Sequence, residues 1–398
     1  MFSKTNFKNK KILVRVDFNV PLNNDFSIAD DTRIIAALPT IKKIVKDGGS
    51  AILMSHLGRP ADGPEEKYSL KHLLKYLKTQ LPFEVIFVED CIGLDVVKAV
   101  KELQPSQILL LENLRFHKEE KEGEQGFAKQ LAHLADIYVN DAFGTAHRAH
   151  ASTAVIANFF EPENKMFGLL MEKEVSNLKL VMASNAKPVT AIIGGAKISG
   201  KIDVVENLLD VVDHLIIGGG MAYTFYKAQG FNIGNSLFEA DRVEVAQAAL
   251  AKAAVNQIQI HLPTDSLVAD NFSENARTQT TIDQNIPLDW MGLDIGPKTI
   301  ANYKTIILNS KTILWNGPMG VFEMEKFKSG TLEIAKAITE ATSKGAYSLV
   351  GGGDSVAALK QFDLQNQVSY ISTGGGAMLE MLEGKELPGV TAISQADA

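Results

Sequence analysis

Short apolar runs alternate along the chain with longer stretches in which apolar residues recur every three or four positions. The short runs have the length of buried strands, and the three- and four-residue spacing is typical of amphipathic helices. In the first half, the predicted strands are Ile12–Val16, Ala51–Met54, Val85–Val88, Ile108–Leu111 and Ile137–Val139, and the predicted helices are Thr32–Lys46, Ser69–Lys78 and Gly126–Leu134. After residue 188 the predicted strands are Val189–Ile193, His214–Ile217, Ile258–Leu262, Thr312–Trp315, Tyr347–Val350 and Tyr370–Ile371. This alternation favours parallel sheets with helical crossovers.

Because the alternation starts again after residue 188, we predict an α/β protein of two doubly wound, parallel-sheet (Rossmann-like) lobes with a cleft between them. Between the lobes, Gly168 to Ser184 has helix formers and an apolar stripe, and Pro188 ends this pattern. A helix joining two lobes would act as a hinge, although an ordinary crossover helix fits the pattern equally well. The predicted division is a first lobe over 1–168, an interdomain helix over 169–187, a second lobe over 188–376 and a C-terminal segment over 377–398.

The composition is that of a globular protein with more than one domain. A chain of 398 residues is long for one core, since domains average about 150 residues. The net charge of -7 gives no reason to expect a nucleic acid or an anionic membrane as a partner. Cys91 is the only cysteine, which excludes an internal disulfide. With no signal-peptide pattern and no apolar run near the roughly 18 residues of a spanning helix, we expect a soluble, cytoplasmic protein.

Arginine and glycine are divided unequally between the two lobes. Five of the seven arginines lie in the first 150 residues, whereas 23 of the 31 glycines follow them. Guanidinium groups bind phosphate and carboxylate with two hydrogen bonds, and glycine lets backbone amides approach a polyphosphate closely. Many of these residues follow predicted strands, and ligands of open α/β sheets bind beyond the carboxyl ends of the strands. The sequence therefore predicts two sites for two different anions.

One phosphate site is predicted where the first strand of the second lobe ends. Two glycines and then Lys197 and Lys201 follow this strand, and Gly195, Gly200 and Lys201 have the spacing of a phosphate loop, G-x-x-x-x-G-K-[ST]. Ile202 stands where that loop has its magnesium-binding hydroxyl. Either the match is accidental, or it belongs to a site whose metal ligand lies elsewhere.

A second glycine-rich turn in this lobe supplies a candidate metal ligand. Gly351, Gly352 and Gly353 precede Asp354 and Ser355 at the start of a predicted helix, where backbone amides can hold an anion. A carboxylate there would repel a phosphate unless a cation lay between them, so Asp354 is the candidate magnesium ligand. The alternative is that it only caps the helix.

Two polar residues that follow another strand of this lobe are further candidates. Asn316 and Glu323 would contact the α-phosphate and the ribose of a nucleotide. Without their neighbours, they would be interpreted as a turn asparagine and a solvated glutamate.

The first lobe holds a cluster of positive charge. Arg33, Arg59, Arg115 and Arg148, with His56, need a small, multiply charged anion, each charged hydrogen bond being worth about 1.5–3 kcal/mol. Asp17 and Asn19 suit a hydroxyl or a carboxylate of the same ligand. The alternative is ion pairing within the protein, which we expect to account for Arg15; it would involve Arg15, Asp17, Asp30, Asp31 and Arg33.

A nucleotide on one lobe, a small anion on the other and a pair of lysines indicate phosphoryl transfer, which needs positioning and charge neutralisation more than an acid or a nucleophile. Another ATP-dependent kinase, acting on a different carboxylate or phosphate acceptor, fits the same features. A nicotinamide dehydrogenase would need G-x-G-x-x-G with an acidic residue about 20 positions later, which no predicted strand end has. A non-catalytic nucleotide sensor would have no use for the arginine cluster.

Ten motifs, in order along almost the whole chain, resemble those of phosphoglycerate kinases. They are RVDFNVP (Arg15–Pro21), DDTRI (Asp30–Ile34), SHLGRP (Ser55–Pro60), LENLRFH (Leu111–His117), NDAFGTAHRAHAS (Asn140–Ser152), GGAKISGK (Gly194–Lys201), GGGMAYTF (Gly218–Phe225), LWNGPMGVFE (Leu314–Glu323), GGGDS (Gly351–Ser355) and STGGGA (Ser372–Ala377). The resemblance implies the glycolytic reaction of 1,3-bisphosphoglycerate with ADP to give 3-phosphoglycerate and ATP, with Mg²⁺. It also implies a monomer that bends at a hinge and closes, and a C-terminal segment that packs on the first lobe.

The resemblance also implies roles for individual residues. Those expected at the transfer step are Arg33, Lys197, Gly352 and Gly375. Those expected to bind 3-phosphoglycerate are Asp17, Asn19, Arg33, His56, Leu57, Gly58, Arg59, Arg115 and Arg148. Those expected to bind the nucleotide are Gly195, Lys197, Lys201, Gly220, Gly292, Asn316, Glu323, Gly351, Gly352, Gly353, Asp354 and Ser355, with Asp354 also on the metal.

Two positions depart from the family pattern. Ser355 stands where many members have threonine, which keeps the hydroxyl. Met378 stands where a serine is expected after STGGGA, so a side-chain hydrogen bond at that position is lost.

Overall fold

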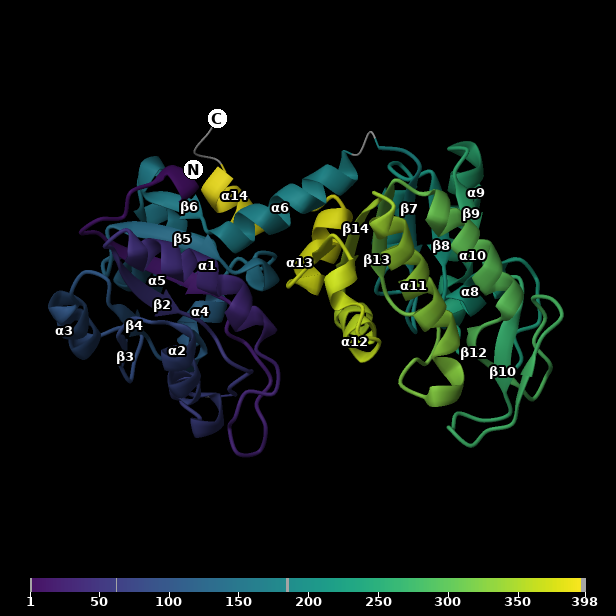
Figure 1. The fold of residues 1–398 in the computed structure, drawn as a ribbon, viewed down its shortest axis with the longest axis horizontal. Coiled ribbons are helices and arrows are strands. Elements are labelled where there is room, and N and C mark those ends of the chain that lie inside the picture. The colour runs from purple at the N-terminus through teal and green to yellow at the C-terminus, as the bar shows by residue number, and fades with distance from the viewer. Residues whose placement is uncertain (1, 62, 184–185, 395–398) are drawn as a thin grey trace. The chain divides into compact units, whose positions relative to one another are not determined.

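The computed structural model describes residues 2–61, 63–183 and 186–394, which form two compact units (Figure 1). The first unit contains the described residues of 1–176 and 386–398, and the second contains those of 177–385. The boundary falls within α6 (Leu169–Met182). The predicted interdomain helix and C-terminal segment also include residues 184–185 and 395–398, which lie outside the described residues.

The first unit is built on six parallel strands in the order β3-β4-β2-β1-β5-β6. Five of them confirm predicted strands. β6 was not predicted, because it has only three residues at the edge of the sheet and one of these is a lysine. The strands are β1 (Lys11–Val16), β2 (Ser50–Met54), β3 (Val85–Phe87), β4 (Ile108–Leu110), β5 (Ile137–Asp141) and β6 (Lys165–Phe167).

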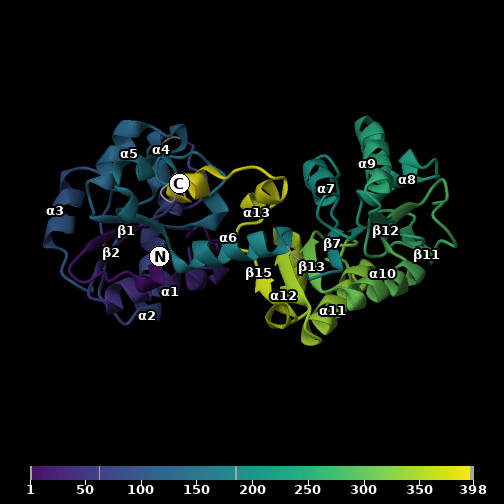
Figure 2. The same cartoon turned by 90° about the horizontal axis from the view of Figure 1, so that it is seen from above.

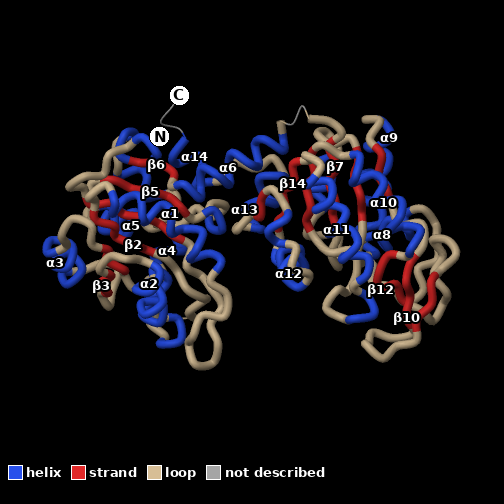
Figure 3. The backbone as a smooth tube through the Cα atoms, viewed as in Figure 1, coloured by secondary structure: helices blue, strands red, loops and turns tan. Residues whose placement is uncertain are grey.

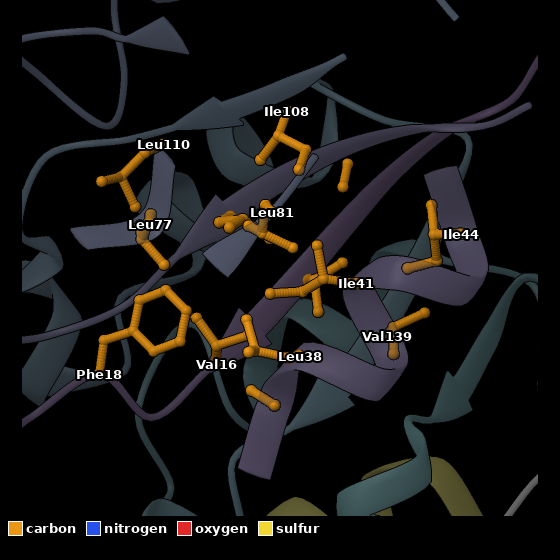
Figure 4. Packing of buried hydrophobic residues seen from close by; sticks show 14 of the residues in the cluster. Val16, Phe18, Leu38, Ile41, Ile44, Leu77, Leu81, Ile108, Leu110 and Val139 are labelled. Atoms are coloured by element: carbon orange, nitrogen blue, oxygen red, sulfur yellow. The ribbon is translucent and has the colours of Figure 1, made fainter. Parts of the chain in front are cut away.

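Helices cover both faces of this sheet because successive side chains of a strand point to opposite faces. Val14 and Val16 of β1 pack with α1 (Thr32–Lys46) and α2 (Leu74–Gln80), whereas Leu13 packs with α3 (Leu94–Glu102) and α5 (Gln125–Ala132). Figure 4 shows the first layer, and Figure 2 shows α1 and α2 on one side of the sheet with α4 (Glu119–Glu122) and α5 on the other. Ile393 of α14 (Pro388–Ser394) joins the second layer, and the Gly389 amide donates to Ala146 O at 2.8 Å.

The second unit repeats the design with six parallel strands in the order β15-β14-β13-β7-β8-β9. All six were predicted; they are β7 (Val189–Ile193), β8 (His214–Ile217), β9 (Gln259–His261), β13 (Thr312–Asn316), β14 (Tyr347–Gly351) and β15 (Tyr370–Ile371). One face is covered by α10 (Pro297–Asn309), α11 (Ser329–Ser343) and α12 (Gly353–Gln361). Figure 2 shows α7 (Ile202–Leu208), α9 (Val243–Val255) and α13 (Gly375–Leu382) on the other face.

A small antiparallel sheet in the second unit was not predicted. It contains β10 (Ser266–Ala269), β11 (Thr278–Thr280) and β12 (Met291–Ile295), and it lies near α8 (Ala222–Ala228) (Figure 3). The sequence signal is weak, because β11 is fully exposed and β12 contains a glycine and an aspartate. Asp265, between β9 and β10, has a structural role: its carboxylate is buried and accepts hydrogen bonds from the Thr299 amide (2.8 Å) and hydroxyl (2.7 Å), which fixes the start of α10.

The sheet of the second unit places glycines from three strands at one edge. Asn316 at the end of β13 is in register with Ile193 of β7 and with Gly351 of β14. The residues that follow these three are all glycines, namely Gly194, Gly317 and Gly352. The chain leaves β7 toward β8 and leaves β13 toward β14, on opposite sides, which is the kind of switch point where open α/β sheets bind ligands. None of the helices in the described part of the chain has the length and apolar character of a membrane span.

The start of α6 is held by a buried carboxyl group at the end of β5. Asp141 Oδ1 accepts a hydrogen bond from the Met171 amide at 3.1 Å. A Cβ at Gly168 would lie only 2.2 Å from this oxygen, so the chain turns into α6 directly over the carboxyl group. Burial raises the pKa of Asp141 to about 7, although the hydrogen bonds from Thr40, Met171 and Leu170 act in the opposite direction.

We predict that Asp141→Asn flattens the pH dependence of the first unit's stability between about pH 4 and pH 7. The folded-state pKa lies above the unfolded value, so the stability that this group contributes is fully present below about pH 4 and is lost as the pH rises to 7. Each pKa unit corresponds to about 1.4 kcal/mol, which bounds the effect at about 4 kcal/mol. Urea unfolding followed by circular dichroism at several pH values measures it. Asp47→Asn, which removes a partly exposed carboxylate paired with Lys43, is the control, and equal pH slopes for wild type and Asp141→Asn would contradict the assignment.

Candidate active site

Two loops of the second unit cross so closely that only glycine fits between them. The Gly194 amide donates to Asn316 O at 3.0 Å, and the Gly195 amide donates to Pro318 O at 3.0 Å. A Cβ at Gly194 would lie 2.1 Å from Pro318 O. Gly194 is therefore required by the approach of two backbones, whether or not a phosphate binds there.

Lys201 joins the two loops. Its Nζ donates to Gly194 O (2.7 Å), Asn316 O (3.1 Å) and Asn316 Oδ1 (2.6 Å), so each of its three protons has an acceptor within the unit. Burial lowers the pKa of Lys201 to about 8, and the charge of Asp354 acts in the opposite direction. In this arrangement, a nucleotide phosphate would reach Lys201 only by displacing one of these acceptors.

Lys197 has a different environment although it belongs to the same loop. It is exposed, and the backbone two residues further on is held by Glu239, whose Oε2 accepts from the Ser199 amide at 2.9 Å. Burial acts to raise the pKa of Glu239, but the hydrogen bonds from Ser199 and Ile198, together with the charge of Lys197, outweigh it and lower the pKa. The ammonium group of Lys197 is thus accessible to a ligand.

The turn before α12 also contains both buried residues that hold the loop and exposed residues that a ligand can reach. Gly352 has φ of +90°, which favours glycine, and α12 begins at the next residue, so Asp354 and Ser355 lie in its first turn. Ser355 is fully buried, and its Oγ accepts from the Gly317 amide at 2.6 Å. Gly353 and Asp354 are exposed. Asn316 is buried, and its Nδ2 donates to Gly351 O at 3.0 Å.

A second helix begins beside this turn. A Cβ at Gly375, the first residue of α13, would lie 3.0 Å from the Gly352 Cα, so the N-termini of α12 and α13 are close together. Met378 is buried, and a Cβ at Gly351 would lie 2.2 Å from its Sδ. The methionine that replaces the expected serine therefore fills the space under the glycine turn with its thioether.

A cavity of about 500 Å³ opens beside these loops, entirely within the second unit. Its lining includes five residues expected to bind a nucleotide: Gly195, Gly220, Gly292, Glu323 and Asp354. The other expected residues lie in the adjoining loops and do not line it: Lys197, Lys201, Asn316, Gly351, Gly352, Gly353 and Ser355. A concave, largely apolar site with a few polar groups is the usual form of a small-molecule pocket.

The apolar wall of this cavity was not predicted from the sequence. It is formed by Tyr223, Leu237, Phe272, Met291, Leu293, Met319 and Val321. Phe272 is 61% exposed and Leu237 is 49% exposed, so they do not serve the core. In the sequence, they resemble ordinary loop residues: Leu237 lies between α8 and α9, and Phe272 lies between β10 and β11 of the small antiparallel sheet.

In the first unit, the loops after neighbouring strands carry the predicted arginine cluster. Arg33 Nη1 donates to Asn19 O at 2.9 Å and lies 3.3 Å from Asp17 Oδ2. Arg115 Nη1 donates to Gly58 O at 2.9 Å, and the Gly58 amide donates to Asn19 Oδ1 at 2.8 Å. These contacts bring predicted residues from three loops together.

Two further arginines extend the cluster. Arg59 and Arg148 are exposed, and neither guanidinium has an ion pair within the described ranges 2–61, 63–183 and 186–394. Burial, aided by the charge of Arg15, lowers the pKa of Arg115 to about 10, so it is still protonated at neutral pH. Asp17 is the one acidic residue among those expected to bind 3-phosphoglycerate, so this set of residues is strongly positive and suited to a multiply charged anion.

Leu57 is buried, and its amide donates to Asn113 Oδ1 at 3.2 Å, which indicates a supporting role.

The expected ion pairing of Arg15 with nearby carboxylates is wrong. Arg15 is fully buried within β1, and its Nε donates to Ser152 Oγ at 2.9 Å. Its Nη1 donates to Val16 O, and its Nη2 lies 3.1 Å from His56 Nδ1. Asp17 pairs with Arg33 instead, because the Arg15 guanidinium is turned to partners that come from distant parts of the chain.

The comparisons with known proteins agree with this geometry. The family model for phosphoglycerate kinase matches residues 2–385. The chain belongs to the phosphoglycerate kinase family. The phosphoglycerate kinase of Porphyromonas gingivalis is 51% identical over 98% of this chain and 98% of its own, and the cytosolic one of Nicotiana tabacum is 51% identical over 99% and 97%. The solved structure of phosphoglycerate kinase from Coxiella burnetii is 42% identical, with a TM-score of 0.89 over 99% of this chain and 98% of that one.

Membership of the phosphoglycerate kinase family confirms several predictions from the sequence. The chain is a phosphotransferase with a carboxyl group as acceptor, and the two six-stranded parallel sheets confirm the α/β fold class. A nucleotide and a phosphoglycerate are the substrates that this activity implies.

We predict that Lys201→Met destabilises the second unit by at least about 2 kcal/mol. The change leaves Gly194 O and Asn316 Oδ1 without a donor and removes one of the two hydrogen bonds to Asn316 O, and an unsatisfied buried polar group costs about 1–3 kcal/mol. Both tryptophans, Trp290 and Trp315, belong to this unit, so urea unfolding followed by tryptophan fluorescence reports its stability. Lys227→Met, at an exposed position of α8, is the control and should change stability by less than about 0.5 kcal/mol. Equal losses for the two variants would show that Lys201 does not hold the crossing.

Proposed function

We propose that 3-phosphoglycerate binds to the arginine cluster of the first unit, and that ADP or ATP binds in the cavity of the second unit. The observation that carries this proposal is the pair of contrasting sites: several guanidinium groups around Asp17 in one unit, and an apolar cavity beside exposed amides and Lys197 in the other. The first suits a small anion with a phosphate and a carboxylate. The second suits a flat base with a polyphosphate tail.

In the first unit, the exposed Arg59 and Arg148 would bind the phosphate or carboxylate of 3-phosphoglycerate, together with Arg33 and Arg115. Asp17, Asn19 and His56 would orient its hydroxyl and carboxyl groups. Leu57 and Gly58 would shape the loop, which the contacts of their amides to Asn113 and Asn19 support.

In the second unit, Gly220 and Gly292 would border the base, and Glu323, which is exposed in the cavity, would accept hydrogen bonds from the ribose. Gly195, Gly353 and Lys197 would contact the phosphates. Gly351, Lys201, Asn316 and Ser355 were expected to bind the nucleotide directly. We now propose that they act mainly by holding these loops, because their polar atoms already have protein partners.

The residues present fit a magnesium ion. Asp354 offers an exposed carboxylate in the cavity lining, and carboxylate oxygen is the usual protein ligand of Mg²⁺. We propose that Asp354 holds the Mg²⁺ of the Mg-nucleotide complex. When bound, the ion would neutralise part of the phosphate charge.

In the direction of ATP use, a carboxylate oxygen of 3-phosphoglycerate attacks the γ-phosphorus of ATP, the bond to the β-γ bridging oxygen breaks, and ADP leaves. The products are the acyl phosphate 1,3-bisphosphoglycerate and ADP, and no protein group has to form a covalent bond. Lys197 and Arg33 would balance the charge of the phosphoryl group during transfer, and the N-termini of α12 and α13, at Gly352 and Gly375, would offer backbone amides to it.

We also propose that the protein is a cytoplasmic monomer. Its lobes, 1–168 and 188–376, would close by bending at residues 169–187, which would bring the two substrates together. The C-terminal segment 377–398 belongs to the same proposal; within it, residues 377–385 group with the second unit and α14 with the first.

We predict that the wild-type protein forms ADP from ATP only when both 3-phosphoglycerate and Mg²⁺ are present, and that Lys197→Ala lowers kcat by at least about 100-fold with smaller changes in KM. An interaction made mainly in the transition state affects kcat in this way. A coupled assay for ADP measures both parameters, and Lys344→Ala, an exposed lysine paired with Glu340, is the control. No turnover by well-folded wild type would refute the proposed function, and an effect of Lys197→Ala on KM alone would refute the role of that lysine.

We also predict that Asp354→Asn weakens ADP binding by about 10-fold in the presence of Mg²⁺ but leaves it unchanged or slightly stronger in the presence of a chelator. The carboxylate favours binding only when a cation lies between it and the phosphates, and otherwise repels them. Isothermal titration calorimetry in both conditions measures the difference, with Asp363→Asn as an exposed control. Equal losses with and without Mg²⁺ would mean that Asp354 is not a metal ligand.

A further inference from the structure

A buried chain of hydrogen bonds lies beneath the arginine cluster of the first unit. Glu120 accepts from Ser152 twice, through Oε1 from the hydroxyl at 2.6 Å and through Oε2 from the amide at 2.9 Å. The Ser152 hydroxyl oxygen in turn accepts from Arg15 Nε at 2.9 Å, and Arg15 Nη2 lies 3.1 Å from His56 Nδ1. Glu120, Ser152 and Arg15 are fully buried, and His56 is 3% exposed.

The sheet order explains how four distant residues come together. Glu120 follows β4, His56 follows β2, Arg15 lies in β1 and Ser152 follows β5, and these four strands are neighbours in the order β4-β2-β1-β5. Each strand therefore contributes one member.

The direction of every hydrogen bond in this chain is fixed by chemistry. A serine hydroxyl has one proton, which points to Glu120, so its oxygen accepts from Arg15. A guanidinium group is always protonated and can only donate. His56 Nδ1 must therefore accept from Arg15, which leaves the ring neutral with its proton on Nε2.

The surroundings of His56 support this protonation state. Burial, followed by the charges of Arg15, Arg115, Arg33 and His150, holds the pKa of His56 well below its usual range. Asp17 Oδ1 is 3.9 Å from Nδ1, which is too far for a hydrogen bond. Within the described part of the chain, no hydrogen bond to Nε2 occurs, so its proton is available to a ligand.

Glu120 is the member that makes the chain possible. A buried guanidinium needs a compensating charge, and Glu120 supplies it through the bridging serine. Without that bridge, Arg15 would lose one of the two contacts, to Ser152 and to Val16 O, that orient its guanidinium toward His56, and Nδ1 would become free to take the proton.

We infer that Glu120 and Ser152 are positioning residues which, through Arg15, hold His56 in the tautomer whose Nε2–H donates to the bound acid. This inference rests on the proposed 3-phosphoglycerate site of the first unit. It assigns a role in substrate binding to two buried residues for which the family resemblance implied no role.

Nitrogen-15 NMR of the histidine rings in the wild-type protein tests the tautomer directly. We expect His56, assigned by comparison with His56→Gln, to carry its proton on Nε2 and to stay neutral from pH 8 to pH 6. A wild-type His56 that is protonated on Nδ1, or that is charged at pH 7, would overturn the inference. This measurement needs no variant of Glu120 or Ser152 and no activity.

The relay, meaning the hydrogen-bond chain from Glu120 through Ser152 and Arg15 to His56, is tested by Ser152→Ala, because this change removes the bridging hydroxyl without adding volume. We expect KM for 3-phosphoglycerate to rise about 5- to 10-fold, with KM for ATP and kcat within about twofold, and His56 to become a mixture of tautomers. Ser50→Ala is the matched control: it removes a buried serine hydroxyl of the same unit, which donates to Gln104 O at 2.9 Å and lies outside the cluster.

The outcomes separate the relay from the proposed function. If Ser152→Ala changes neither the tautomer nor KM for 3-phosphoglycerate more than Ser50→Ala does, the relay is wrong although the function stands. If the wild type shows no turnover but His56 has the expected tautomer, the proposed function fails and the hydrogen-bond chain stands without its ligand. If Ser152→Ala does not fold, Glu120→Gln is examined instead, and an unchanged His56 tautomer in that variant would overturn the relay.

Discussion

The crossing of two backbone loops at the switch point of the second unit is the constraint on which its site depends. Gly194 and Pro318 lie so close that a single methyl group would force them apart, and Lys201 bonds to both loops. This arrangement fixes the path of the chain after β7 and β13, and hence the position of the exposed Lys197. The Gly317 amide in the loop after β13 also donates to Ser355, beside Asp354 in the first turn of α12. A loosened crossing would alter the proposed phosphate-binding surface without any change in the residues that line it.

The two proposed anion sites are built in different ways although the folds of the two units are alike. In the first unit, the segments after β2, β4 and β5 carry Arg59, Arg115 and Arg148, and the first turn of α1 carries Arg33. Backbone oxygens orient two of these guanidinium groups: Gly58 O that of Arg115, and Asn19 O that of Arg33. In the second unit, the strand ends contribute glycines, which bring backbone amides and the N-termini of α12 and α13 close to the same edge. Charged side chains suit a small anion that is bound from several directions, and backbone amides suit a polyphosphate that lies along a surface.

The sequence predicted most of the fold because its strands are buried on both faces and therefore form continuous apolar runs. Eleven predicted strands were found, whereas the edge strand β6 and the antiparallel sheet β10–β12 were not, because they are short, exposed or interrupted by glycine and aspartate. The same sheet carries part of the apolar wall of the cavity, so Met291 and Leu293 were also missed. Motif order identified the family, but the contacts of individual side chains depended on tertiary structure.

In both candidate sites, some charged and polar residues are buried and hold the loops, whereas others are exposed and can reach a ligand. Residue type does not distinguish the two groups. Arg15 and Arg148 have the same side chain, yet the first is fully buried and the second is exposed. Lys201 and Lys197 differ in the same way within one loop. The buried Arg15 donates a hydrogen bond to Ser152, 137 residues away, and Lys201 donates one to Asn316, 115 residues away. Because buried polar groups must be satisfied and exposed ones need not be, these long-range pairings decide which arginines and lysines remain accessible to a ligand.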